Sequence, residues 1–127
     1  MNIVDSSGWI EYIADDANAD FFEPPIVDSE NLLVPTICLY EVFKRVLQEF
    51  GEERALDAMG IMSLGTVIDL DLQIAIHAAQ ISNELKLAMA DSIILATARA
   101  YDATLWTQDE HFKGIDGVNL VKKKSRK

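Results

Sequence analysis

Cysteine, proline and glycine are all scarce in this chain of 127 residues. The single cysteine, Cys38, excludes an internal disulfide, and its place in the apolar run 37–40 indicates a small buried thiol. Three prolines and six glycines, in a chain that is half hydrophobic and one quarter charged, exclude a collagen-like or disordered protein. The chain is therefore expected to be globular and to function in a reducing environment, by default the cytoplasm.

The sequence also lacks a long apolar run. Its longest apolar segments, near residues 74–81 and 87–98, are too short and too interrupted to span a bilayer. The N-terminus has no basic segment followed by an apolar one, so no signal peptide is expected. We therefore expect no membrane association.

Lysine and arginine are also few relative to the acidic residues. The chain has 11 Lys and Arg residues against 21 Asp and Glu residues, a formal net charge of −10. Five of the basic residues lie in the tail 122–127, so the remainder has six basic and 21 acidic residues and a charge of −15. A body this acidic binds nucleic acid poorly unless cations or a partner intervene. The tail is either a solvated end or a contact for an anion.

The length and the pattern predict one domain over residues 1–121 followed by the basic tail. Short β-branched or apolar runs at 2–4, 32–34, 66–70, 104–107 and 118–121 are typical of buried strands. Helical periodicity lies between them, near 9–13, 37–50, 52–63, 72–85 and 90–101. This alternation predicts an α/β fold, with a central parallel sheet of about five short strands covered by helices on both faces.

Local signals predict where the helices begin and end. Pro24 and Pro25 are expected to break the helical pattern and to open a loop that lasts to Asn31. Thr36 and Asp71 are expected to cap the helices that follow them. In the helix at 37–50, one stripe is expected to face the core; it comprises Leu39, Phe43, Val46, Leu47 and Phe50.

Two acids directly follow predicted strands. Asp5 comes after the first strand, and Asp109 follows the strand at 104–107. Ligands of open α/β sheets collect beyond the carboxyl ends of the strands, so both are candidate site residues. An N-cap or turn explains each equally well.

Two further acids lie on predicted helices. Asp91 shares a helix face with apolar residues such as Leu87 and Ile94, where an ionised carboxylate is costly unless a cation pairs with it. Its alternative role is a helix N-cap. Glu41 is sufficiently explained by an i,i+4 pair with Arg45, worth about 0.3 kcal/mol. If the four acids converge, hard divalent ions such as Mg²⁺ or Mn²⁺ relieve their mutual repulsion.

Four short segments, in this order and spacing, give the chain a resemblance to PIN-domain ribonucleases, and specifically to VapC-type toxins. They are residues 3–7 (IVDSS), 39–42 (LYEV), 90–98 (ADSIILATA) and 105–112 (LWTQDEHF). Each segment is weak alone, but together they span the chain from residue 2 to 121. The resemblance implies a PIN-like α/β/α sandwich around a parallel sheet.

The resemblance also implies a set of site residues. Asp5, Glu41, Asp91 and Asp109 are the implied catalytic and metal-binding acids, and Ser6 and Thr107 are the implied supporting hydroxyls. Basic residues implied to contact RNA phosphates are Lys44, Arg45, Arg99 and Lys113, although each is equally explained as a solvated charge. Asp116 corresponds loosely to an additional acid of some members.

The function implied is metal-dependent endoribonucleolytic cleavage of RNA phosphodiesters, with Mg²⁺ or Mn²⁺ as cofactor. A divalent ion supplies hydroxide near neutral pH and offsets charge on the phosphate, so neither histidine is required. His111 either touches substrate or is a surface residue. The implied partners are RNA, a cognate antitoxin protein that blocks the acidic cluster, and a second copy in a homodimer.

Two other functions remain open. The first is a catalytically inactive PIN-like module whose carboxylates cap helices and which only binds a protein partner. The second is a phosphohydrolase that uses Asp5 as a phosphoryl nucleophile. That class expects an Asp-x-Asp loop, whereas Ser7 occupies the second position.

Overall fold

The computed structural model describes residues 1–124, so residues 125–127 of the expected basic tail lie outside the described residues. The strands are β1 (Asn2–Val4), β2 (Leu32–Pro35), β3 (Thr66–Ile68), β4 (Thr104–Thr107) and β5 (Val118–Leu120). The helices are α1 (Ser6–Ile13), α2 (Ala19–Val27), α3 (Thr36–Phe50), α4 (Glu52–Met62), α5 (Leu72–Leu85) and α6 (Met89–Ala100). Two short 3₁₀ helices, η1 (Ser29–Asn31) and η2 (Glu110–Phe112), complete the order.

The five strands form one parallel sheet in the order β3-β2-β1-β4-β5. Ile3 in β1 lies opposite Leu33 of β2 on one side and Leu105 of β4 on the other. The chain moves from β1 outward to β2 and β3, and then returns to the other side of β1. The direction of strand order therefore reverses between β1 and β4, which is where open α/β sheets bind ligands.

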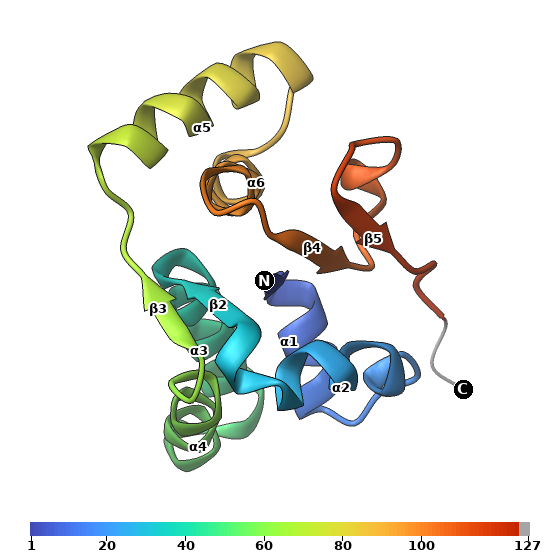
Figure 1. Ribbon diagram of the computed structural model, residues 1–127. Helices are drawn as coiled ribbons and strands as arrows, with labels where there is room; N and C mark the ends of the chain where they lie inside the picture. The colour runs from blue at the N-terminus through green and yellow to red at the C-terminus, as the bar shows by residue number, and fades with distance from the viewer. Residues whose placement is uncertain (125–127) are drawn as a thin grey trace.

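This topology also decides which helices cover which face. Connections between parallel strands are right-handed, so α1 to α4 lie on one face and the returning pair α5–α6 lies on the other. Figure 1 shows the two groups on opposite sides of the strands. The expected α/β/α sandwich with a parallel sheet of five short strands is confirmed.

The core is built from the strands and the inner helix faces. Ile3, Val34 and Leu105 are fully enclosed in the sheet, and Trp9 and Phe22 pack from α1 and α2. Gly8 permits that packing, because a Cβ atom at this position would lie only 2.5 Å from the Phe22 ring and 2.7 Å from Val4. A buried small thiol was expected at Cys38, and it is confirmed.

Two local expectations are wrong. Pro24 and Pro25 lie inside α2 rather than ending a helix, and η1 occupies part of the expected loop. Each proline removes one intrahelical N–H donor, but burial of Phe22, Pro25 and Ile26 holds the helix against the core. Thr36 is the first residue of α3 and Pro35 takes the cap position without a side-chain hydrogen bond. The cap at Asp71 is confirmed by a 2.9 Å bond from the Ile74 N–H to the carboxylate.

The buried face of α3 matches the expected stripe only in part: Val46 is buried, and Leu39 and Phe43 pack against the core. Cys38, Val42 and Val46 face the core, whereas Leu47 and Phe50 are exposed. Helical periodicity locates an apolar stripe but does not say whether the core or solvent lies beside it. None of the helices within residues 1–124 has the length and apolar character needed to cross a membrane.

Candidate functional site

The four acids predicted from the sequence all come from segments at the carboxyl-terminal edge of the sheet. Asp5 follows β1, and Asp109 follows β4, its neighbour in the sheet. Glu41 lies in the second turn of α3, which begins where β2 ends, and Asp91 lies in the first turn of α6. Helix α6 leads into the start of β4, so its own N-terminus lies at the same edge as the ends of the strands.

Asp5 is buried and held by three hydrogen bonds. Its Oδ1 accepts from the Ser7 hydroxyl and from the Gly8 N–H, both at 2.9 Å. Its Oδ2 accepts from the Thr107 hydroxyl at 2.5 Å. The bond from Gly8 makes Asp5 the N-cap of α1, as one of its two sequence interpretations predicted. Thr107 is in contact with the acid that it was predicted to support.

These hydrogen bonds do not offset the cost of burying the charge. Burial raises the pKa of Asp5 from 3.8 to about 6, although the bonds from Thr107, Gly8 and Ser7 act to lower it. The charge of Asp109 raises it further. Asp5 is therefore a carboxylate that a nearby cation would stabilise.

The sequence offered a purely structural role for Glu41, an i,i+4 ion pair with Arg45, and this ion pair does not form. Arg45 pairs with Glu49 one turn further along α3. Instead, Glu41 accepts a 2.6 Å hydrogen bond from the hydroxyl of Ser6, 35 positions earlier in the chain. Ser6 thus holds the acid beside the start of α1, next to Asp5.

Asp91 is not a helix cap, because Ala88 takes that position without a side-chain hydrogen bond. Burial, and then the charge of Asp109, raise the pKa of Asp91, and Glu41 adds to that effect. The charge of His111 acts in the opposite direction. Asp91 is therefore in electrostatic contact with both Asp109 and Glu41.

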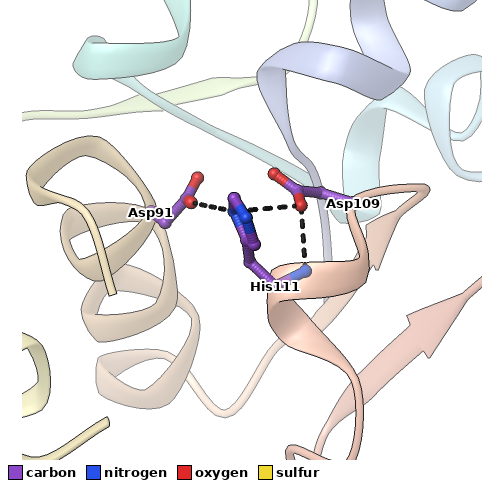
Figure 2. A group of neighbouring side chains, drawn as sticks. All are labelled: Asp91, Asp109 and His111. Carbon is purple, nitrogen blue, oxygen red and sulfur yellow. Dashed lines mark hydrogen bonds and ion pairs between the residues drawn. The ribbon is translucent and has the colours of Figure 1, made fainter. Parts of the chain in front are cut away.

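Asp109 is positioned from two sides. Its backbone N–H donates to the Thr107 hydroxyl at 2.9 Å, and its Oδ1 accepts from the His111 N–H at 2.9 Å. The second bond caps η2, so the turn interpretation of Asp109 also holds. The His111 Nδ1 lies 3.3 Å from the Asp109 Oδ1 and 3.7 Å from the Asp91 Oδ2. Figure 2 shows the imidazole between the two carboxylates.

The four acids thus form one electrostatic neighbourhood. Asp109 acts on both Asp5 and Asp91, and Glu41 acts on Asp91. Among residues 1–124, no lysine or arginine forms an ion pair with any of the four. Oxygen ligands gathered without a lysine or arginine partner are the donor set that hard divalent cations prefer.

The predicted basic residues are spread over the molecule. Arg45 lines a cavity of about 600 Å³ together with Ser7 and Gln108, which adjoin the acidic residues in sequence. Lys44 lies over the ring of Tyr40, and Lys113 is exposed directly after η2. Arg99 lies eight residues after Asp91 on α6, about 12 Å further along the helix axis, toward the opposite edge of the sheet. Asp116 precedes β5 and borders a cavity there with Arg99, away from the four acids.

A buried polar network beside the site was not predicted. Glu11 in α1 accepts from the Asn18 N–H at 2.8 Å and from the Gln108 side-chain amide at 3.1 Å. Asn18 also donates to the Gln108 side chain and to the carbonyl of Lys122. The network fixes the residue preceding Asp109 and the start of the basic segment. Glu11 and Gln108 are 97 positions apart in the sequence, and Asn18 and Lys122 are 104 positions apart, so no local pattern indicated the network.

Comparison with known proteins gives a consistent picture. The family model described as PIN domain matches residues 3–118. A toxin–antitoxin complex from Klebsiella pneumoniae contains a chain that is 24% identical, with a TM-score of 0.77 over 94% of this chain and 96% of that one. A chain of DNA-bound VapBC from Salmonella typhimurium is also 24% identical, with a TM-score of 0.76 over 96% and 98%.

A more distant structure has the same fold. The sarcin-ricin loop cleaving toxin VapC20 of Mycobacterium tuberculosis is 16% identical, with a TM-score of 0.76 over 91% of this chain and 95% of that one. At these identities the likenesses establish the fold. No match was found among curated proteins.

Proposed function

The chain belongs to the PIN-domain family, and from that premise we propose that it is a divalent-metal-dependent endoribonuclease, the toxin of a type II toxin–antitoxin pair. One observation carries the proposal. Four acids from distant parts of the chain share one edge of the sheet, and two of them, Asp5 and Asp91, have a raised pKa. This acidic centre has no lysine or arginine ion pair within residues 1–124 and lies at the edge of the sheet where open α/β folds bind ligands.

The residues present fit a divalent cation. Asp91, Asp109 and His111 each offer one ligand atom within 4.8 Å of the others. We propose that Asp5, Asp91 and Asp109 hold Mg²⁺ or Mn²⁺, with Glu41 as a direct or water-mediated ligand. When bound, the ion supplies positive charge to the phosphodiester and acidifies a water molecule beside it.

The chain's own side chains prepare this centre. Thr107 donates to Asp5 and accepts from the Asp109 N–H, so it sets the separation of two acids from neighbouring strands. Ser7 and Gly8 orient the other oxygen of Asp5. Ser6 holds Glu41 over the same edge. The acids are therefore preorganised before any ion binds, which lowers the cost of assembling the site.

A basic segment shares a cavity with residues near the candidate acids in sequence, and the same cavity is also lined by Glu11, Asp16 and Glu49. Lys123 and Lys124 line the same 600 Å³ cavity as Arg45, Ser7 and Gln108. This location follows from topology: β5 is parallel to β4, so the chain leaves the sheet at the edge where β4 leads to Asp109. We propose that these three cations bind phosphates on one side of the scissile bond. Lys44 and Lys113 remain proposed contacts, and Arg99 lies away from this cavity.

Exposed apolar side chains support protein partners. Leu72 and Ile76, one turn apart on α5, are 75% and 53% exposed. Contiguous exposed apolar surface is typical of protein interfaces. The proposed partners are a cognate antitoxin, which would cover the acidic centre, and a second copy of the chain. A cytoplasmic location is part of the same proposal.

RNA cleavage by the purified chain tests the proposal. We expect cleavage of single-stranded and structured RNA in Mg²⁺ or Mn²⁺, abolished by EDTA and by Asp91→Asn. The matched control is Glu53→Gln, an exposed acid on α4, which should leave cleavage unchanged. Circular dichroism verifies that each variant is folded.

The alternative, an inactive module that only binds a protein, is favoured by one fact: Asp5 and Asp109 both cap helices. Absence of cleavage in both metals would favour it, whereas cleavage equally strong in Asp91→Asn would show that the acidic centre is not the source of the activity.

A further inference from the structure

His111 was expected to be either a substrate contact or a surface residue, and the structure places its exposed side chain at the surface, against the carboxylates of Asp91 and Asp109. Its Nδ1 is the third atom of the Asp91–Asp109 cluster, and all three donor atoms lie within 4.8 Å of one another. We propose that His111 supplies a nitrogen ligand to the divalent cation, so that the centre prefers Mn²⁺ over Mg²⁺. This inference rests on the proposed metal-dependent function and specifies its metal.

The spacing of the three atoms is compatible with ligands around one ion, as well as with ion pairs between the imidazole and the carboxylates. Charge-assisted N–H···O contacts are about 2.7–2.9 Å long. The two contacts of the His111 Nδ1 are 3.3 Å and 3.7 Å. Ligands about 2.1 Å from an octahedral ion lie roughly 3 Å apart when adjacent and roughly 4 Å apart when opposite. The two separations from the His111 Nδ1 lie between these values, and all three donor atoms lie within 4.8 Å of one another.

The backbone of His111 is fixed, although its ring is accessible. Phe112, the next residue, is fully buried and anchors η2. The His111 N–H donates to the Asp109 Oδ1, so the histidine and the carboxylate are held together through the main chain. The side chain is 74% exposed and borders a cavity of about 530 Å³ with residues 85–88. An ion entering from solvent therefore meets the imidazole and both carboxylates together.

The chemistry of the donor predicts the metal preference. Mg²⁺ is a hard ion that takes oxygen ligands and retains much of its water, whereas imidazole suits first-row transition metals. A site of carboxylates alone discriminates little between Mg²⁺ and Mn²⁺. Addition of one imidazole nitrogen strengthens Mn²⁺ binding selectively. Exchange of His111 for a residue with an oxygen donor should therefore remove the preference and leave a functional oxygen site.

Electron spin-echo spectroscopy of the Mn²⁺-loaded full chain tests the assignment directly. We expect a histidine nitrogen modulation in the wild type, its loss in His111→Gln, and its retention in His77→Gln. His77, the only other histidine in the sequence, lies on α5 and lines a different cavity. Absence of the modulation in the wild type, or its persistence in His111→Gln, overturns the proposal, as does failure of Mn²⁺ to bind.

Calorimetric titration with each metal gives an independent readout. His111→Gln should weaken Mn²⁺ binding by about tenfold or more and Mg²⁺ binding by less than about threefold. If the His111 imidazole is instead a positively charged group that pairs with the carboxylates, it competes with the metal ion. The substitution His111→Gln then strengthens Mn²⁺ binding, which overturns the proposal. The two proposals fail separately. RNA cleavage without nitrogen modulation rejects only the ligand role, and modulation without cleavage rejects only the ribonuclease.

Discussion

The burial of Asp5 predicts that the metal-free protein is destabilised by one of its own carboxylates. The pKa of Asp5 rises from 3.8 to about 6 on folding because of burial. Below pH 3.8 the carboxyl group of Asp5 is protonated in both the folded and unfolded states, so its burial does not lower the free energy of unfolding. Between pH 4 and 6 the folded state binds the proton more tightly, so stability falls as the pH rises. Above pH 6 the full penalty is present, about 3 kcal/mol for a shift of this size.

Asp5→Asn removes the charge and keeps the shape of the side chain. The Asn oxygen can still accept from Ser7 and Gly8, but its NH₂ group would face the Thr107 hydroxyl, which now donates to Asp5. Thr107 would have to accept from that NH₂ group, which leaves its own O–H without its buried acceptor at a cost of about 1 kcal/mol. We therefore expect the variant to be about 2 kcal/mol more stable than the wild type at pH 7.5, and equal to it or less stable at pH 4.

Urea unfolding in EDTA, followed by circular dichroism from pH 4 to 7.5, measures this difference. Asp57→Asn, at an exposed position on α4, is the control and should show no pH-dependent difference. Saturating Mn²⁺ should stabilise the wild type and remove the advantage of Asp5→Asn. If Asp5→Asn is as destabilising at pH 7.5 as at pH 4, the charge of Asp5 costs nothing in the folded state and the reasoning is refuted.

Three further predictions follow from the same contacts. Millimolar Mn²⁺ or Mg²⁺ should raise the melting temperature of the wild type but not of Asp91→Asn, because the ion binds only the folded centre; equal shifts in a thermal melt would contradict this. Gly8→Ala should lower the free energy of unfolding by about 1–3 kcal/mol, since its Cβ would lie 2.5 Å from the Phe22 ring; an unchanged urea midpoint would show that the ring moves aside freely. The double variant Lys123→Glu, Lys124→Glu should weaken RNA binding and flatten its salt dependence, measured by fluorescence anisotropy in an Asp91→Asn background; an unaltered salt slope would place the RNA elsewhere.

The α/β architecture was readable from the sequence because it depends on local patterns. Short apolar runs alternating with helical periodicity are sufficient to predict a parallel sheet, and the strand at 104–107 matches β4 residue for residue. The four candidate acids were also named from the sequence: Asp5 and Asp109 from their positions after strands, Asp91 from its apolar helix face, and Glu41 only from the family resemblance. The prolines of α2 show the limit of local signals, since burial of Phe22 and Ile26 outweighs the lost hydrogen bonds.

What the linear pattern determined about this protein is the order of its strands, the order of its helices apart from α2, and the identity of its candidate acids, because propensity and periodicity act over a few residues. Only the tertiary structure decided which charges meet. The 2.6 Å bond between Ser6 and Glu41, the raised pKa of Asp5 and the place of His111 between Asp91 and Asp109 depend on contacts between distant segments. Burial and Coulomb interactions are set by those contacts, and they decide whether an acid is a solvated surface charge or a ligand for a cation.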